Sequence, residues 1–174
     1  AQKVYDILNS TLDLNNNCLT VTGCIGMCYL EPIVDVYADD GLHRFVKVNG
    51  EIAEKIATAI NNNDLLSVKE FEISDDDKQF LDKQTRIALR HCGVINPEII
   101  EDYTNDDGYK ALNKVLTTMS PEDVIEEIKT SGLAGRGGAG FPTWFKWNAA
   151  RQSVGEKKYL ICNADEGDPG AFMD

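Results

Sequence analysis

Apolar residues recur every four positions in two segments of the first third of the chain. Val4, Leu8 and Leu12 form one series, and isoleucines repeat in the same way across residues 52–60. Side chains four residues apart share one face of a helix, so each series predicts a short amphipathic helix. A run of asparagine and aspartate at residues 61–64 predicts the end of the second helix.

Three segments between these helices have the composition of β-strands. Residues 19–22 are β-branched and half apolar, and residues 33–37 and 44–48 alternate apolar with polar side chains. The turn sequence Asp-Asp-Gly at residues 39–41 predicts a hairpin between the last two strands. Together these elements predict a small α/β unit over residues 1–63.

The pattern changes after this unit. Residues 64–77 hold six acidic residues and one lysine, which favours a solvated linker, placed at residues 64–81, over an acidic recognition patch. Helical periodicity then predicts three helices, at residues 82–92, 97–103 and 108–119.

The last part of the chain combines helix signals with glycine. The sequence Ser-Pro-Glu-Asp at residues 120–123 is a strong helix start, and Ser131-Gly132 predicts the end of that helix. A glycine-rich loop follows, and then a helix over residues 144–151. Residues 159–162 have strand composition, and residues 163–170 form a predicted loop.

Composition excludes several classes of protein. The chain has 174 residues, with 17 basic and 29 acidic side chains and a net charge of −12, so its field opposes binding to nucleic acid or to anionic lipid. No apolar run approaches the ~18 residues of a membrane span. Five cysteines without the spacing of a disulfide-rich secreted domain indicate a reducing compartment, and we expect the cytoplasm.

The glycine loop is the first candidate for chemistry. Residues 135–140 match the pattern G-x-G-x-x-G, but a Rossmann fingerprint requires a preceding strand, and here a helix is predicted before the loop. Closely spaced glycines let backbone amides approach a phosphate, and Arg136 adds a cation. An anion cradle and a flexible turn therefore both stay open.

Aromatic residues and a lysine follow this loop. Lys146 lies between Phe145 and Trp147, where it suits a phosphate or a flavin edge, although a lysine that extends from an apolar face to solvent is an equal alternative. Phe141 suits stacking on a ring or a place in the core.

A second candidate loop follows residues 159–162 and carries three carboxylates and an asparagine, residues 163–170. Ligands bind at the carboxyl ends of parallel strands, and these groups can accept hydrogen bonds from sugar or ring donors. A solvent-facing acidic turn is the alternative.

Cys24 and Cys28 form the spacing C-x3-C in a glycine-containing loop. Two such thiolates suit an iron–sulfur cluster, although a [2Fe–2S] centre takes four protein ligands. The remaining cysteines have the character of structural thiols. No arrangement of Ser, His, Asp or Cys indicates nucleophilic catalysis, and we assign no catalytic residue.

Three stretches together resemble a known family. Residues 130–174 include TSGLAGRGGAGFPTWFKW and YLICNADEGDPGAFMD, which resemble the FMN- and NADH-binding flavoprotein subunit of respiratory complex I. They also resemble the diaphorase-type (beta) subunits of NAD(P)-dependent, often electron-bifurcating, [FeFe] hydrogenases and formate dehydrogenases, and the fused upstream domain makes this branch the closer resemblance. The upstream TGCIGMCYLEPIVDV resembles the thioredoxin-like [2Fe–2S] ferredoxin domain fused to the hydrogenase-type subunits.

The resemblance implies a fold and a division into domains. An incomplete thioredoxin-like ferredoxin domain would occupy residues 1–63, and the acidic linker residues 64–81. The start of a complex-I-type FMN-binding α/β domain would occupy residues 82–174. The first residues have the pattern of the middle of a helix, and the chain stops just after the predicted loop with no element to close the fold, so we expect a segment of a longer protein.

The resemblance also implies site residues. Those expected to hold FMN are Gly135, Arg136, Gly137, Gly138, Ala139, Lys146, Asn163, Asp165, Glu166 and Gly167. Phe141 would stack on the NADH adenine, and Asp168 would lie near the nicotinamide. Cys24 and Cys28 would supply half of a [2Fe–2S] site. Trp144 and Phe145 replace a usual Gly-Leu pair and put bulk beside the cofactor loop.

The implied activity is electron transfer between NAD(P)H and iron–sulfur clusters through FMN. It would take place within a multi-subunit hydrogenase, formate dehydrogenase or NADH dehydrogenase, with iron–sulfur subunits as partners and a [4Fe–4S] centre further along the protein. A cofactor-free scaffold or interaction domain is the main alternative, and a Rossmann dehydrogenase is a third.

Overall fold

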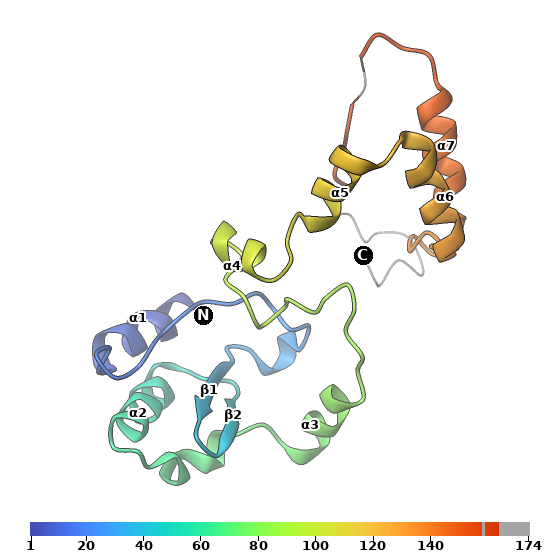
Figure 1. The fold of residues 1–174 in the computed structure, drawn as a ribbon. Helices are drawn as coiled ribbons and strands as arrows, with labels where there is room; N and C mark the ends of the chain where they lie inside the picture. Colours follow the sequence, from blue (N-terminus) through green and yellow to red (C-terminus); the bar gives the residue numbers. More distant parts are fainter. Residues whose placement is uncertain (158, 164–174) are drawn as a thin grey trace. The chain divides into compact units, whose positions relative to one another are not determined.

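The computed structural model describes residues 1–157 and 159–163. The chain divides into two compact units, Ala1–Asp106 and Asp107–Asp174. The described residues contain both helices and strands, so the predicted mixed α/β class is confirmed (Figure 1). None of the described helices has the length and apolar character needed to cross a membrane.

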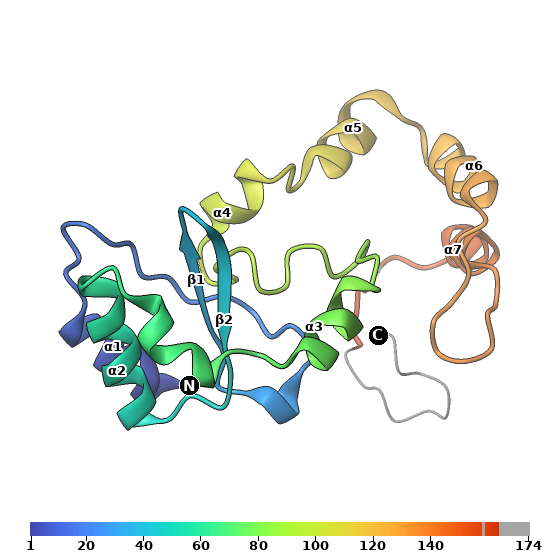
Figure 2. The same cartoon turned by 90° about the horizontal axis from the view of Figure 1, so that it is seen from below.

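Two helices form one side of the first unit's core. Helix α1 (Gln2–Thr11) and helix α2 (Gly50–Asn61) lie side by side, as Figures 1 and 2 show. The four-residue repeats put apolar side chains on one face of each helix. These two faces pack together and bury Val4 and Leu8 against Ile56. The Asn61 side chain joins the helix ends, accepting from the amide of residue 13 at 3.0 Å and donating to the carbonyl of residue 11 at 2.9 Å.

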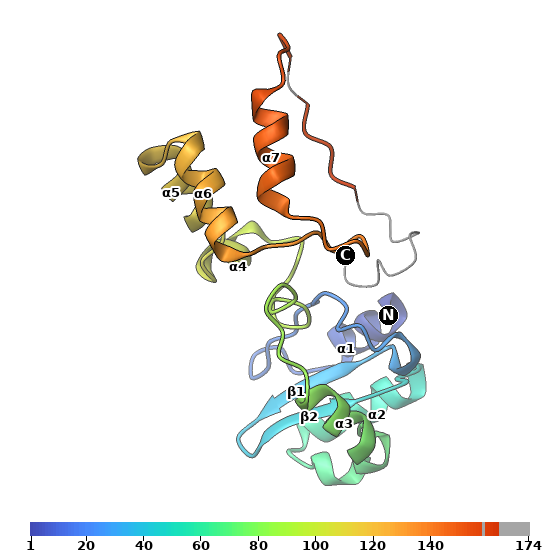
Figure 3. The same cartoon turned by 90° about the vertical axis from the view of Figure 1, so that its right-hand side faces the viewer.

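The predicted hairpin is confirmed as strands β1 (Val34–Ala38) and β2 (Gly41–Phe45), which pair antiparallel (Figure 3). The second strand lies three residues earlier than the predicted 44–48. On this hairpin Arg44 donates two hydrogen bonds to the carboxylate of Asp35, at 2.8 and 2.7 Å. The predicted strand at residues 19–22 is wrong. In the described part of the chain the sheet has two strands, so this β-branched segment has no strand to pair with.

The acidic segment at residues 64–81 packs onto this core. It contains the 3₁₀ helix η2 (Leu65–Phe71), where Val68 is 3% exposed, and helix α3 (Asp75–Asp82). Its backbone continues the edge of β2, because the amide of Ile73 donates to the carbonyl of Arg44 at 2.8 Å. Most of the acids face solvent while Val68 and Leu81 are buried, so the segment is part of the first unit.

The helix predicted at residues 82–92 is wrong. Helix α3 begins earlier, because Ser74 caps it by accepting from the amide of Asp77 at 3.2 Å, and three aspartates occupy its first turn. Residues 83–99 form turns, and helix α4 (Ile100–Asn105) is shorter than the predicted 97–103 segment and shifted from it.

The second unit is helical. Helices α5 (Lys110–Thr118), α6 (Pro121–Ser131) and α7 (Thr143–Gln152) confirm three predictions, and α6 packs against α7 (Figure 1). A capping box between Ser120 and Asp123 starts α6. The strand predicted at residues 159–162 is wrong, because Tyr159, Leu160 and Ile161 are more than 80% exposed and have no neighbouring strand among the described residues.

One histidine links β2 to the segment that follows η2. His43 Nδ1 lies 2.7 Å from Glu72 Oε1, and His43 Nε2 lies 3.0 Å from Asp40 Oδ1. The hydrogen bond with Glu72, followed by the one with Asp40, raises the pKa of His43 above its usual 6.5. Protonation of His43 therefore stabilises the folded state.

We expect the substitution His43→Gln to destabilise the protein at low pH only. A raised folded pKa gives stability that is fully present below the unfolded value and is lost as pH rises through the folded value. At about pH 5.5 the free energy of unfolding should fall by up to about 1 kcal/mol, the upper end for solvent-open ion pairs. At about pH 9 wild type and variant should unfold at closely similar urea concentrations.

The control is Glu72→Gln, which removes the main cause of the shift and should abolish most of the pH dependence of the His43→Gln difference. An equal loss of stability at both pH values would contradict the assignment.

Candidate functional site

The glycine loop is a closed turn between α6 and α7. The amide of Gly135 donates to the carbonyl of Phe141 at 2.7 Å, and the amide of Thr143 donates to the carbonyl of Leu133 at 3.1 Å. These bonds belong to an antiparallel bridge between Ala134 and Pro142. The loop therefore lies at the N-terminus of α7, where the helix dipole favours an anion.

Backbone conformation explains why the loop is rich in glycine. Gly138 and Gly140 have φ angles of 98° and 62°, in the left-handed region, where a side chain is strained. Within the described part of the chain, the amides of residues 136–140 have no hydrogen-bond acceptor. These amides and the exposed Arg136 fit the phosphate end of a nucleotide such as FMN.

The loop brings two of the predicted residues together. Lys146 Nζ lies 5.4 Å from the centroid of the Phe141 ring, and the Phe141 and Phe145 rings meet edge to face at 5.6 Å. Phe141 is 43% exposed, so it keeps surface that a planar ring could cover. An aromatic face beside an ammonium group suits a ligand that combines a ring with negative charge.

Trp144 contributes to the contact between helices α6 and α7. It is half-buried, and Lys129 Nζ of α6 lies 5.5 Å from its ring. Its ring also meets Phe145 edge to face at 5.7 Å. At the opposite ends of the two helices, Arg151 of α7 pairs with Glu122 of α6. The large Trp144 side chain therefore joins α6 to α7 and orients the loop between them.

The second predicted loop has one residue, Asn163, within the described part of the structure. Asn163 is exposed and is the last described residue. The predictions at Asp165, Glu166, Gly167 and Asp168 lie outside the described residues.

The cysteine loop is a second site, in the first unit. Cys24 Sγ and Cys28 Sγ lie 4.0 Å apart, and the Cys24 thiol donates to Glu31 Oε1 at 3.0 Å. The amide of Gly26 donates to Cys24 Sγ at 3.3 Å, and Gly26 has a φ of 85°. The hydrogen bond to Glu31 is the main cause that raises the pKa of the Cys24 thiol, and it outweighs the opposing Gly26 amide.

Sequence reasoning missed Glu31 as a member of this group. The 3₁₀ helix η1 (Cys28–Leu30) reverses the chain and returns Glu31 to the two sulfurs. The spacing of a carboxylate three residues after Cys28 is the signal that could have indicated it. Within the described residues, these three form the one group whose ligand atoms all lie close enough to share a metal ion.

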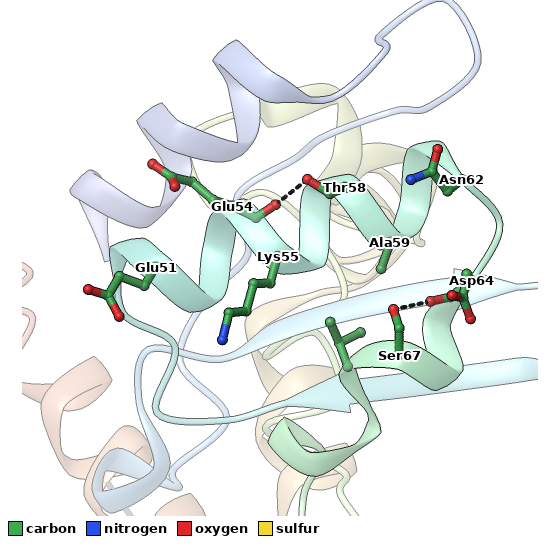
Figure 4. A pocket seen from close by; sticks show the side chains of 9 residues that line it. Glu51, Glu54, Lys55, Thr58, Ala59, Asn62, Asp64 and Ser67 are labelled. Atoms are coloured by element: carbon green, nitrogen blue, oxygen red, sulfur yellow. Dashed lines mark hydrogen bonds between the residues drawn. The ribbon is translucent and has the colours of Figure 1, made fainter.

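An open groove of about 550 Å³ between α2 and η2 holds none of the predicted residues (Figure 4). Two of its polar side chains have local partners: Thr58 donates to the carbonyl of Glu54, and Ser67 donates to the carbonyl of Asp64. Lys55 lies 5.3 Å from the Phe71 ring. The groove therefore presents no convergent chemistry.

Comparison with known proteins finds a family match over the segment that contains the glycine loop. Residues 128–174 match the family described as the Nuo51 FMN-binding domain. This segment contains the glycine loop, Lys146 and the second loop. The family match thus covers the site that the geometry fits to a ring with a phosphate group.

Relatives extend the similarity over about half of the chain. The chain is 58% identical over 92 residues to the NADP-reducing hydrogenase subunit HndC of Solidesulfovibrio fructosivorans, covering 53% of this chain and 18% of the relative. It is 46% identical over 88 residues to an NADH-quinone oxidoreductase subunit of Rhizobium meliloti, covering 51% and 21%. An NADH-quinone oxidoreductase subunit of Escherichia coli is 40% identical over 79 residues, covering 45% and 18%.

These matches confirm the resemblance seen in the sequence, to flavoprotein subunits of the complex I type and to their hydrogenase counterparts. The matched region spans about a fifth of the length of these curated relatives.

The backbone of the loop gives a test of its own. We expect Gly138→Ala to cost about 1 kcal/mol, because it places a side chain at a φ of 98°. The amide of Gly135, which closes the loop, should then exchange its hydrogen about 5-fold faster. Gly137→Ala is the matched control, because that glycine has open space around it and no positive φ. Equal exchange in the two variants would show that the φ at residue 138 does not hold the loop closed.

Proposed function

We propose that this chain is part of a flavoprotein subunit that transfers electrons between NAD(P)H and iron–sulfur centres through FMN. The observation that carries the proposal is the closed glycine loop at the N-terminus of α7, within the segment that matches an FMN-binding family. The loop supplies a cation, an aromatic face and amides that have no acceptor among the described residues, which together fit a flavin mononucleotide.

The proposed FMN site combines both candidate loops. Residues 135–139 offer amides and the Arg136 guanidinium to the phosphate end, and Lys146 offers a charge-assisted hydrogen bond. Hydrogen bonds to the sugar and the ring of FMN would come from Asn163, Asp165, Glu166 and Gly167. Bound FMN would exchange a hydride with NAD(P)H and pass on electrons singly.

Two residues are proposed for the nicotinamide nucleotide. Phe141 would stack on the adenine, since this residue is 43% exposed and Lys146 Nζ lies 5.4 Å from the centroid of its ring. Asp168 would lie near the nicotinamide. It carries the same negative charge as a glutamate would at this position, but on a shorter side chain.

Cys24 and Cys28 are proposed ligands of a [2Fe–2S] cluster. Two thiolates bind each iron of such a cluster, and sulfurs 4.0 Å apart fit one iron. Among the described residues no further cysteine lies beside them, so the second pair would come from elsewhere in the protein. Residues 1–63 would then form the ferredoxin domain, and residues 82–174 the start of the FMN- and NADH-binding domain.

The assembly and its location follow from the same proposal. A subunit of this class would work in a hydrogenase, formate dehydrogenase or NADH dehydrogenase complex, with iron–sulfur subunits as partners and [4Fe–4S] centres in the electron path, in the cytoplasm. A cofactor-free scaffold is less well supported, because a scaffold would not need a row of loop amides presented beside a cation. The Rossmann alternative is disfavoured because helix α6 precedes the glycine loop.

The test is an anaerobic absorption spectrum of the purified protein, before and after NADH and then NADPH. We expect a flavin band that bleaches with one of the nucleotides, together with loss of iron–sulfur absorbance. A protein that contains no flavin after incubation with FMN would overturn the proposal.

A lysine variant tests the site itself. We expect Lys146→Ala to weaken FMN binding on the order of 10- to 100-fold, because hydrogen bonds from a charged group contribute about 1.5–3 kcal/mol. Lys114→Ala on α5 is the matched control and should bind FMN as wild type does, by fluorescence titration. If both variants bind equally, Lys146 does not contact the cofactor.

A further inference from the structure

We propose that the turn at residues 91–94 holds the cysteine loop in place, with Gly93 as a positioning residue for Cys24 and Cys28. The turn belongs to the same compact unit as the two cysteines. The inference rests on the proposed function, which assigns these two thiols to a [2Fe–2S] cluster. Gly93 acts through Ile25, which lies between the two cysteines in the sequence.

Gly93 lies too close to the cysteine loop for any other residue to fit there. A Cβ atom placed on Gly93 would lie 2.3 Å from Ile25 Cγ2 and 4.0 Å from the carbonyl oxygen of Gly23. Carbon atoms that are not bonded have their optimal separation at about 3.5–4.0 Å, so a side chain would collide with Ile25. Gly93 also has a φ of 76°, in the left-handed region. Since Gly23 and Ile25 flank Cys24, the turn lies against the loop at that cysteine.

Ile25 is also held by the core of the first unit. It packs against the small apolar cluster of Met27, Leu30 and Leu81, all of which are buried. The turn therefore adds a second contact to a side chain that the core already holds. Because Ile25 follows Cys24 directly in the sequence, the two contacts together restrict the backbone that carries the thiol.

The turn is braced by residues before and after it in the sequence. Arg86 Nη1 donates to the carbonyl of Cys92 at 3.2 Å, in a partly buried hydrogen bond. His91 Nδ1 lies 2.6 Å from Asp106 Oδ2, and its ring meets that of Tyr103 on α4 edge to face, with 5.8 Å between the centroids. Hydrogen bonds that involve a charged group are stronger than neutral ones. The turn is therefore anchored independently of its contact with the cysteine loop.

The consequence of this contact is a fixed separation of the two thiols before a cluster forms. Their sulfurs lie 4.0 Å apart, and a [2Fe–2S] cluster is held by such thiolates. Ligands that the surrounding packing holds in place keep a metal group in one geometry. Loss of the contact should leave both thiols present but allow their separation to vary.

Amide hydrogen exchange in the reduced, cluster-free chain tests the contact directly. The amide of Gly26 donates to Cys24 Sγ at 3.3 Å, and the amide of Leu30 donates to the carbonyl of Met27 at 2.9 Å. We expect Gly93→Ala to accelerate the exchange of both amides roughly 5- to 30-fold, because overpacking typically costs an amount of stability that corresponds to this factor. Wild-type exchange rates in this variant would overturn the proposal.

A second substitution separates the collision from the strain of a positive φ, which every Gly93→Ala variant retains. With Ile25→Ala present, the new Cβ would lie 3.8 Å from the Cβ of residue 25, an ordinary contact. The acceleration caused by Gly93→Ala should then be about 5-fold smaller. Ile25→Val keeps a methyl group at Cγ2 and should give no such relief. Equal effects of Gly93→Ala in all three backgrounds would contradict the contact.

Three further variants serve as controls. Arg86→Ala loosens the turn without adding atoms and should accelerate the same amides, whereas Arg90→Ala removes an exposed arginine of the same segment and should not. Gly41→Ala introduces strain at a φ of 133° with open space around it, in the same unit but at the hairpin turn. Equal rates in the two arginine variants, or an equal acceleration by Gly41→Ala, would show a general loss of stability and overturn the proposal. Far-ultraviolet circular dichroism checks the fold of every variant.

The role toward the thiols is measured by the electron paramagnetic resonance spectrum of the reduced [2Fe–2S] cluster in the purified protein. We expect Gly93→Ala to shift or broaden the signal, and the added Ile25→Ala to restore much of it. An unchanged spectrum in Gly93→Ala would refute the positioning role. A wild-type protein without this signal would instead contradict the proposed cluster, while hydrogen exchange still decides whether the turn holds the loop.

Discussion

Burial of the Phe45 side chain at the end of β2 is the contact on which the first unit depends. Phe45 is fully buried, and it joins the hairpin to the apolar face of α2, where Ile56 is also fully buried. The segment after η2 then aligns along the edge of the same strand, through the pairing of Phe45 with Glu72. Because the core is small, each large side chain in it fixes several elements at once.

The second unit is organised by hydrogen bonds and ring contacts. None of its described residues is buried, so the pairing of α6 with α7 relies on the Lys129–Trp144 contact, the Arg151–Glu122 ion pair and the bridge that closes the glycine loop. Surface interactions of this kind are individually weak. The loop amides are nevertheless aligned, because the two backbone bonds at residues 133–143 restrict the loop from both ends.

Local signals made the helices and the hairpin predictable from sequence. The isoleucine repeat of α2, the Ser-Pro-Glu-Asp start of α6 and the Asp-Asp-Gly turn each act over a few residues, and each is present in the structure. Residues 19–22 and 159–162 were predicted as strands from composition, but a strand also requires a partner, which composition does not encode. The acidic content of residues 64–77 likewise predicted a solvated linker, although the Val68 side chain within it is buried.

The two candidate sites also differ in how far they could be predicted from the sequence. The glycine loop could be predicted because its chemistry is contiguous in sequence, and its contact between Lys146 and Phe141 spans only one turn of helix and a short loop. Glu31 could not, because its approach to Cys24 depends on the reversal of the chain through η1. That reversal in turn requires Met27 and Leu30 to be buried beside Leu81, a residue of the segment predicted as linker. The acidic segment therefore positions the carboxylate at the cysteine pair, and the geometry of that pair depends on packing contacts made some fifty residues away along the chain.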